Sequence, residues 1–146
     1  MRILVAEDDP DVGKLLDVVF RGFDHEVDVV EDGAAAINAL ERASYDVAVV
    51  DVMMPKVDGL EVTKHIRRHE AAKDLPVVIL TAKGNEEGHV HGYDAGADAY
   101  VTKPFRPIEL HDTVLEVVGR KPSERHRVRQ QERAKAEFLR KLENRF

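Results

Sequence analysis

Five short apolar runs alternate with stretches in which apolar residues recur every three or four positions. The runs cover residues Ile3–Ala6, Glu26–Val30, Val47–Val50, Val77–Leu80 and Ala99–Val101. Runs of this length are typical of strands that are buried on both faces of a sheet, whereas the spacing between them is that of amphipathic helices. Helices are predicted over residues Pro10–Phe23, Gly33–Ala43, Asp58–His69, Glu86–Ala95 and Pro107–Val118.

This alternation predicts an α/β fold. Strands separated by helices of this length pair in parallel through right-handed crossovers. We therefore expect a doubly wound, five-stranded parallel sheet with helices on both faces and the strand order 2-1-3-4-5, as in flavodoxin-like folds. Asp9 and Asp32 are expected to cap the first two helices, and Pro10 suits the first helical position.

Residues 121–146 differ from the preceding residues in charge. Residues 1–120 hold 13 Lys and Arg against 24 Asp and Glu, whereas residues 121–146 hold 9 against 4. We therefore divide the chain into one domain, 1–120, and a C-terminal extension, 121–146, which is a basic amphipathic helical tail or a signalling linker. Its helix is predicted over residues Glu124–Arg145 with Ser123 as the N-cap. The apolar residues on one side of this helix are Val128, Phe138, Leu139, Leu142 and Phe146.

Three functions compete for this extension. We favour packing against a partner or a second copy as a short coiled coil, and we expect the apolar side rather than the charge to decide where the helix docks. Alternatively, the extension is the start of a linker to a further domain. Binding of nucleic acid through its arginines ranks last, because no groove-binding motif is recognisable, and direct nucleic-acid binding is not expected. Those arginines are Arg125, Arg127, Arg129 and Arg133.

Composition excludes several kinds of site. The chain has no cysteine, which excludes disulfides and zinc-thiolate sites and makes a cytoplasmic location the default expectation. No apolar run approaches the roughly 20 residues of a membrane span, so membrane insertion is not expected. The seven histidines are scattered along the sequence, and we assign none of them to a site.

Polar residues cluster where the predicted strands end. Glu7 and Asp8 follow the first strand, and Asp51 follows the third. Because ligands of open α/β sheets bind at the carboxyl ends of the strands, these carboxylates are expected to meet. Oxygen ligands of this kind suit Mg²⁺, which Mn²⁺ can replace. We expect Asp8 and Asp51 to bind the cation directly, the backbone carbonyl of Met53 to add a ligand, and Glu7 to hold a metal-bound water.

The same edge has the groups needed to receive a phosphoryl group. A carboxylate nucleophile such as Asp51 gives an aspartyl-phosphate. Lys103 is a point charge suited to a phosphoryl oxygen, and its bond to the following proline favours a cis peptide. The Thr81 hydroxyl and the Ala82 amide are expected to bind the other oxygens. Tyr100 is then expected to rotate into the space that Thr81 leaves.

Four sequence segments carry a resemblance to a known family. They are Ile-Leu-Val-Ala-Glu-Asp-Asp at 3–9, Val-Val-Asp-Val-Met-Met-Pro-Lys-Val-Asp-Gly-Leu-Glu at 49–61, Pro-Val-Val-Ile-Leu-Thr-Ala at 76–82 and Gly-Ala-Asp-Ala-Tyr-Val-Thr-Lys-Pro-Phe at 96–105. Because these four segments occur in this order and at these spacings, residues 1–119 resemble the receiver domain of bacterial two-component response regulators. The resemblance is to the chemotaxis type of receiver fold. The resemblance implies a phosphorylation-dependent switch rather than an enzyme with a separate substrate, one that catalyses its own phosphorylation and dephosphorylation.

The resemblance also implies residue roles and partners. Asp51 matches the phosphoacceptor, Thr81 and Tyr100 match the switch pair, and Lys103 matches the phosphate-binding lysine. The expected phosphodonor is a sensor histidine kinase or a phosphotransfer protein, and a homodimer through the last receiver face or the tail is possible. The output is either protein–protein contact by a single-domain regulator, or control of an effector or kinase in a larger protein.

Two positions depart from the pattern of receivers that have winged-helix DNA-binding partners. Ala99 stands where those proteins usually have a second Asp, and His111 replaces a common arginine. The charge network through which that subgroup dimerises is therefore in doubt.

Two other classes fit the sequence poorly. A haloacid-dehalogenase type enzyme needs a second aspartate two residues after its nucleophile, where this chain has Met53. A nucleotide-binding domain needs a glycine-rich loop after the first strand, and here that loop is acidic.

Overall fold

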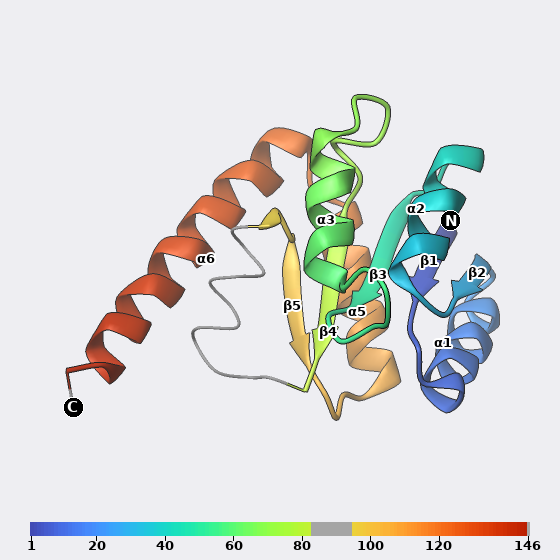
Figure 1. Cartoon of the computed structure of the whole chain (residues 1–146), viewed down its shortest axis with the longest axis horizontal. Helices are drawn as coiled ribbons and strands as arrows, with labels where there is room; N and C mark the ends of the chain where they lie inside the picture. The colour runs from blue at the N-terminus through green and yellow to red at the C-terminus, as the bar shows by residue number, and fades with distance from the viewer. Residues whose placement is uncertain (83–94, 146) are drawn as a thin grey trace.

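The computed structural model describes residues 1–82 and 95–145, in which five strands form one parallel sheet in the order β2-β1-β3-β4-β5 (Figure 1). The strands are β1 (Arg2–Ala6), β2 (Glu26–Val30), β3 (Val47–Asp51), β4 (Val77–Thr81) and β5 (Ala99–Thr102). The helices are α1 (Pro10–Gly22), α2 (Gly33–Arg42), α3 (Gly59–Arg68), α5 (Pro107–Val118) and α6 (Pro122–Glu143). The predicted doubly wound sheet and C-terminal helix are confirmed. Of the helix predicted over Glu86–Ala95, only Ala95 lies within the described residues.

Two apolar cores lie on opposite faces of the sheet. Successive residues of a strand point to opposite faces, so Ile3 and Val5 of β1 join one core while Leu4 and Ala6 join the other. The first core is closed by α1 and α5, which contribute Leu16, Phe20, Leu110, Val114 and Val117. The second is closed by α2 and α3, which contribute Ala36, Val62 and Ile66. Burial on both faces explains why the strands are continuous apolar runs.

The helix starts follow the predicted caps except in α6. The side chains of Asp9 and Asp32 accept hydrogen bonds from the Asp11 and Ala35 amides at 3.0 and 2.8 Å. The prediction that Ser123 caps α6 is wrong. The N-cap is Lys121, which makes no side-chain capping bond, and the next residue is a proline at the first helical position. Proline fits there because its φ is already helical and its missing N–H would have no partner within the helix.

Polar contacts of two arginines join the first turns of α6 to the domain. The buried residues of α6 are Arg125 and Ala136, whereas Phe138 is 61 % exposed. Val128, Leu139 and Leu142 are partly buried, and the expectation that the apolar side decides where this helix docks stays a prediction. Phe146 lies outside the described residues. Among the described helices, none is both long and apolar enough to cross a membrane.

Two histidines that are far apart in the sequence meet beside α1. His25 Nε2 lies 2.9 Å from His111 Nε2, and His25 Nδ1 lies 3.1 Å from the amino group of Met1. His111 is 5 % exposed and stacks on Phe23 with a centroid distance of 3.8 Å. A short contact between two ring nitrogens requires one of them to be unprotonated. The pair therefore favours at most one charged ring.

This pair should make stability depend on pH. Burial, followed by repulsion from the amino group and from His111, lowers the pKa of His25. The folded state then favours neutral His25, so its contribution is present above the unfolded pKa of about 6.5 and is lost as pH falls below that value. We expect wild type to lose more unfolding free energy than His25→Gln between pH 7.5 and 5, measured by urea unfolding. Equal losses in both proteins would contradict this role.

Candidate functional site

Three carboxylates meet at the carboxyl ends of β1 and β3. Glu7 follows β1 directly and is 1 % exposed, and Asp51 is the last residue of β3 and is 4 % exposed. Asp8 is exposed at the rim. One oxygen of each side chain lies within 4.8 Å of the others. The parallel pairing of neighbouring strands thus brings together acids that are 43 residues apart.

The backbone around Asp51 is held on both sides. The amide after it, of Val52, donates to the carbonyl of Leu80 at 3.0 Å, which ties the end of β3 to β4. Gly59, the first residue of α3, donates to the Val52 carbonyl at 3.0 Å. A Cβ on Gly59 would lie 2.2 Å from the carbonyl oxygen of Asp51. Only glycine therefore allows the start of α3 to approach the site so closely.

Lys103 enters the site from the loop after β5. Its Nζ lies 2.8 Å from Glu7 Oε1 and 3.2 Å from Asp51 Oδ2. Its amide donates to the Thr81 carbonyl at 2.7 Å, and the Lys103–Pro104 peptide is cis, as the sequence predicted. The ammonium therefore lies between the two buried carboxylates.

The protonation of this group reflects both burial and charge. Burial, together with the hydrogen bond to Asp51, raises the pKa of Glu7 to about 7, against the lowering effect of Lys103. Burial lowers the pKa of Lys103, but the bonds and charges of Glu7 and Asp51 outweigh it and raise the pKa above its ordinary value. The ammonium is therefore held charged beside Glu7, whose buried carboxylate is costly to ionise.

The remaining predicted site residues lie on β4 and β5 or directly after β3 and β4. Thr81 is fully buried at the end of β4, and Tyr100 is half-buried on β5. Burial raises the pKa of Tyr100, and its hydrogen bond with Thr81 opposes that rise. Ala82 is exposed, and the Met53 amide donates to Asp51 Oδ1 at 3.3 Å. The contact between Thr81 and Tyr100 joins β4 to β5 next to the carboxylates.

The residues present suit a divalent cation. Glu7 Oε2 is buried without a hydrogen-bond partner among the described residues, although a buried carboxylate oxygen is normally bonded. Three carboxylates close together repel one another unless a cation lies between them. The donors are all oxygens, which is the set that Mg²⁺ prefers. The carboxylate cluster, with its one orphaned oxygen, therefore fits such an ion.

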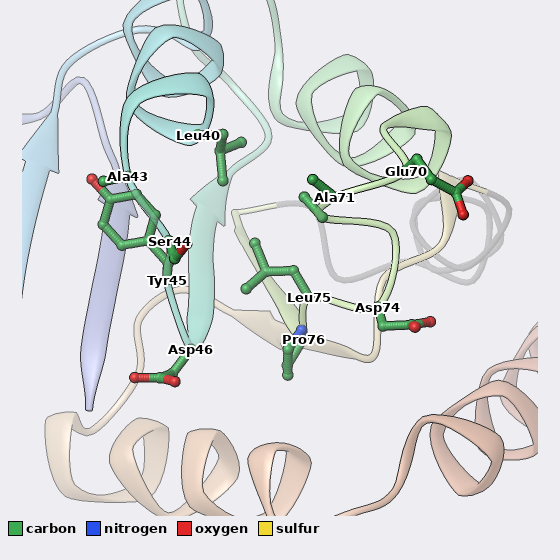
Figure 2. A pocket seen from close by; sticks show the side chains of 11 residues that line it. Leu40, Ala43, Ser44, Tyr45, Asp46, Glu70, Ala71, Asp74, Leu75 and Pro76 are labelled. Atoms are coloured by element: carbon green, nitrogen blue, oxygen red, sulfur yellow. The ribbon is translucent and has the colours of Figure 1, made fainter.

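The opposite edge of the sheet has a hollow of its own. A cavity of about 340 Å³ lies between the end of α2 and the connection from α3 to β4, and Figure 2 shows its lining. Leu40 and Leu75 line it together with the carboxylates of Asp46 and Asp74. It lies at the amino ends of β3 and β4, away from Asp51 and Lys103. Its lining provides no nucleophile next to a cation, so we place the chemistry at the carboxyl edge.

Comparison with known protein families identifies the family to which the chain belongs. The model of the response regulator receiver domain matches residues 3–115. The chain belongs to this family. The resemblance inferred from the sequence is confirmed, and receiver domains of this family are parts of two-component signalling systems.

Curated relatives of this receiver are longer proteins. The chain is 44 % identical over 110 residues to the transcriptional regulatory protein TcrA of Mycobacterium tuberculosis. These residues cover 75 % of this chain and 43 % of TcrA. It is 38 % identical over 119 residues to the phosphate regulon transcriptional regulatory protein PhoB of Escherichia coli. These residues cover 82 % of this chain and 52 % of PhoB. The chain thus spans about half the length of the curated relatives that it matches.

Solved receiver structures share the fold across most of the chain. The receiver domain of the sensor histidine kinase PA1611 from Pseudomonas aeruginosa, with a magnesium ion in its active site cleft, has a TM-score of 0.76 and 30 % identity. The alignment covers 82 % of this chain and 98 % of that one. The receiver domain of the Francisella response regulator 1452 has a TM-score of 0.74 and 33 % identity, over 80 % and 95 %.

One prediction about partners is wrong. No groove-binding motif is recognisable in residues 121–146, and on that ground direct nucleic-acid binding is not expected. The relatives nevertheless include the DNA-binding response regulator MtrA of Mycolicibacterium smegmatis, 39 % identical over 109 residues, which cover 75 % of this chain and 46 % of MtrA. These relatives are about twice as long as this chain, so a DNA-binding motif of theirs need not lie in the part that matches residues 1–146.

The structure also shows contacts that the sequence analysis missed. The pairing of Lys103 with Glu7 is not predicted from the sequence, which assigns Glu7 to the metal site and Lys103 to a phosphoryl oxygen. Asp98, in the segment that carries the resemblance, was given no role, yet it binds arginines of two helices. The i, i+4 spacing of Arg125 and Arg129 was the available signal, since it places both on one side of a helix.

Proposed function

We propose that this receiver accepts a phosphoryl group on Asp51 and changes conformation around Tyr100 and α5 in response. The observation that supports this proposal is the position of Lys103. Its ammonium contacts Asp51 and Glu7 while Thr81 lies at the neighbouring strand end. This edge of the sheet thus combines a nucleophilic carboxylate, a positioned ammonium group and a hydroxyl. Phosphoryl transfer requires groups of these kinds.

Each residue has a distinct task in this proposal. A carboxylate oxygen of Asp51 attacks the phosphorus of the donor, the bond from phosphorus to the donor atom breaks, and the donor leaves with that electron pair. Lys103 exchanges its contact with Asp51 for a phosphoryl oxygen. Thr81 and the Ala82 amide donate hydrogen bonds to the other oxygens. Tyr100 follows Thr81, since the two side chains are bonded to each other before the reaction.

A divalent cation completes the site. We propose that Asp8, Asp51 and the Met53 carbonyl hold Mg²⁺ or Mn²⁺, with Glu7 orienting a bound water. The ion would neutralise negative charge that develops on the transferred group. The matched receiver of PA1611 holds magnesium in its cleft, which supports this assignment.

The metal requirement tests the proposal directly. Wild-type protein incubated with radiolabelled acetyl phosphate is expected to gain label with Mg²⁺ or Mn²⁺ and to gain none in excess EDTA. The label should be stable in acid and lost in hydroxylamine, as an acyl phosphate is. Full labelling in EDTA would refute the metal assignment.

Lys103→Ala should separate metal binding from signalling. The ammonium competes with Mg²⁺ for Glu7 and Asp51, so its removal should tighten Mg²⁺ binding by roughly tenfold, equivalent to about 1.4 kcal/mol, as measured by titration of amide chemical shifts. The fold should persist, because Lys103 lies at the rim, while beryllofluoride should no longer shift the Tyr100 resonances. Lys64→Ala, on the exposed side of α3, is the control and should change neither quantity. Unfolding of Lys103→Ala would show instead that the residue is structural.

We also propose a phosphodonor and an output for this receiver. A sensor histidine kinase is the expected donor, and a cytoplasmic location remains a prediction. Relatives named as transcriptional regulators favour control of transcription as the output. Pull-down of genomic fragments with the phosphorylated and the unphosphorylated chain tests this output. Enrichment of the same promoter fragments only in the phosphorylated sample is the expected result.

A further inference from the structure

Asp98 is a buried acid at the start of β5, at the edge of the sheet opposite to Asp51. Its backbone amide donates to the Val77 carbonyl at 2.8 Å, and its carboxylate accepts from the Val77 amide at 2.9 Å. Only 1 % of its side chain is exposed. The first residues of β4 and β5 are therefore joined through Asp98 on both its backbone and its side chain.

Three guanidinium groups surround this carboxylate. Arg67 of α3 binds it at 2.8 Å and also donates to the Gly96 and Leu75 carbonyls at 2.9 and 2.6 Å, so it belongs to the domain itself. The other two come from α6. Arg129 Nη1 lies 2.6 Å from Asp98 Oδ1, and Arg125 Nε lies 3.7 Å from the same oxygen.

Arg125 fixes the start of α6 further. Its guanidinium donates to the Arg120 carbonyl at 2.8 Å and also to the Asp74 carbonyl, beside the cavity in Figure 2. The exposed fractions of the Arg125 and Arg129 side chains are 6 % and 18 %. Charge pairs this well shielded from water are screened little by salt. Arg125 and Ala136 are the buried residues of the described part of α6, and Arg129 is partly buried.

Asp98, which binds the arginines of α6, and Lys103 of the candidate site lie at the two ends of one short strand. Figure 1 shows α6 starting near the beginning of β5 and running diagonally away from the sheet. β5 has four residues, with Asp98 immediately before it and Lys103 immediately after it. Tyr100 lies between them, and β5 pairs only with β4 among the described strands. Movement of one end of so short a strand will shift the other.

We propose that Asp98 and the arginines of α6 form a releasable clasp that stabilises the resting position of β5. The coupling part rests on the function proposed above. When Lys103 turns from Asp51 toward a phosphoryl oxygen, the end of β5 moves and the geometry at Asp98 becomes less favourable for Arg129. Because coupling between two sites is reciprocal, opening the clasp must favour occupation of the Asp51 site by the same factor.

Arg129→Gln in the full chain tests the docking. Asp98 itself is a poor choice, because it also holds Val77 and Arg67. Arg127→Gln is the matched control, since Arg127 is exposed on the same helix. A helix of about 22 residues is marginal in water when it is not packed. Amides of residues 125–140 should therefore exchange at least about tenfold faster in Arg129→Gln than in the control. Equal exchange in the two variants overturns the clasp.

Beryllofluoride with Mg²⁺ tests the coupling in the same two variants. The midpoint concentration should fall about fivefold or more in Arg129→Gln, in the range usual for coupled sites, and stay unchanged in Arg127→Gln. Equal midpoints overturn the coupling while leaving the function of the site intact. If wild type does not bind beryllofluoride at all, the proposed function fails and the coupling fails with it. The exchange result then still decides whether Asp98 anchors α6.

Discussion

Asp51→Asn is expected to abolish labelling of the protein by acetyl phosphate. An amide oxygen is a far weaker nucleophile than a carboxylate and does not form a stable acyl phosphate. Asp51 is 4 % exposed, and its carboxylate lies 3.2 Å from the Lys103 ammonium, which Glu7 also contacts at 2.8 Å. We expect Asp51→Asn to incorporate at least about a hundredfold less label per mole of protein than wild type after one hour with Mg²⁺. This loss is equivalent to about 2.7 kcal/mol in the activation free energy of phosphoryl transfer.

Asp46→Asn is the control for this experiment. Asp46 lies just before the other end of β3 and accepts a hydrogen bond from the Arg2 amide at 2.7 Å. An asparagine there retains an acceptor oxygen, so the fold and the labelling should both remain close to wild type. Circular dichroism of both variants should match wild type. Normal acid-stable labelling of Asp51→Asn would assign the phosphoacceptor to another residue, with Asp8 as the next candidate.

The sheet could be predicted because the pattern and the packing agree. A parallel strand covered by helices on both faces must be apolar at nearly every position, and this requirement identifies β1, β3 and β4 in the sequence. The alternation of strands and helices then restricts the topology to a few choices. Asp9 and Asp32 mark helix starts through local hydrogen bonds, which depend only on residues close in sequence. For these features, short-range and long-range preferences point to the same structure.

The candidate site was only partly predictable. Strand order places Glu7, Asp8 and Asp51 at one edge, so the carboxylate cluster follows from the topology. The pairing of Lys103 with Glu7 does not follow, because it depends on how a loop of the last strand turns back over the sheet. Without coordinates, Lys103 could reach either carboxylate. Geometry at the scale of one side chain decides between them.

Contacts across distant elements were the least predictable. The pair formed by His25 and His111 joins residues 86 positions apart through a single nitrogen contact. Arg125 and Arg129 looked like solvent-exposed charges, because basic residues on a helix usually are. The buried partner Asp98 changes that interpretation, since a buried carboxylate needs a charged or hydrogen-bonding partner. The i, i+4 spacing of Arg125 and Arg129 places them on one side of the helix, but it does not show which residue of the domain they bind.

Gly59→Ala should cost more stability than any surface change, because it alters the backbone that carries Asp51. The added Cβ would lie 2.2 Å from the Asp51 carbonyl oxygen and 3.0 Å from Val50 Cγ1. Both neighbours belong to the central strand β3, whose five residues are all buried, so neither can move freely. Steric crowding in a packed core usually costs about 1–3 kcal/mol, and contact with a fixed carbonyl should exceed that range. We expect a loss of about 3 kcal/mol or more in urea unfolding.

The control for this change is Gly22→Ala, and it separates steric crowding from chain entropy. A Cβ at Gly22, the last residue of α1, meets nothing within 4 Å, so the substitution should be neutral or stabilise the fold by up to about 1 kcal/mol. Relief of the clash at Gly59 requires α3 or the end of β3 to shift, and either movement displaces the Asp51 carboxylate from Lys103. Labelling by acetyl phosphate should therefore fall in Gly59→Ala even at temperatures where the protein remains folded. Wild-type stability and labelling in Gly59→Ala would mean that α3 can retreat without disturbing the site, and that its close approach is not what positions Asp51.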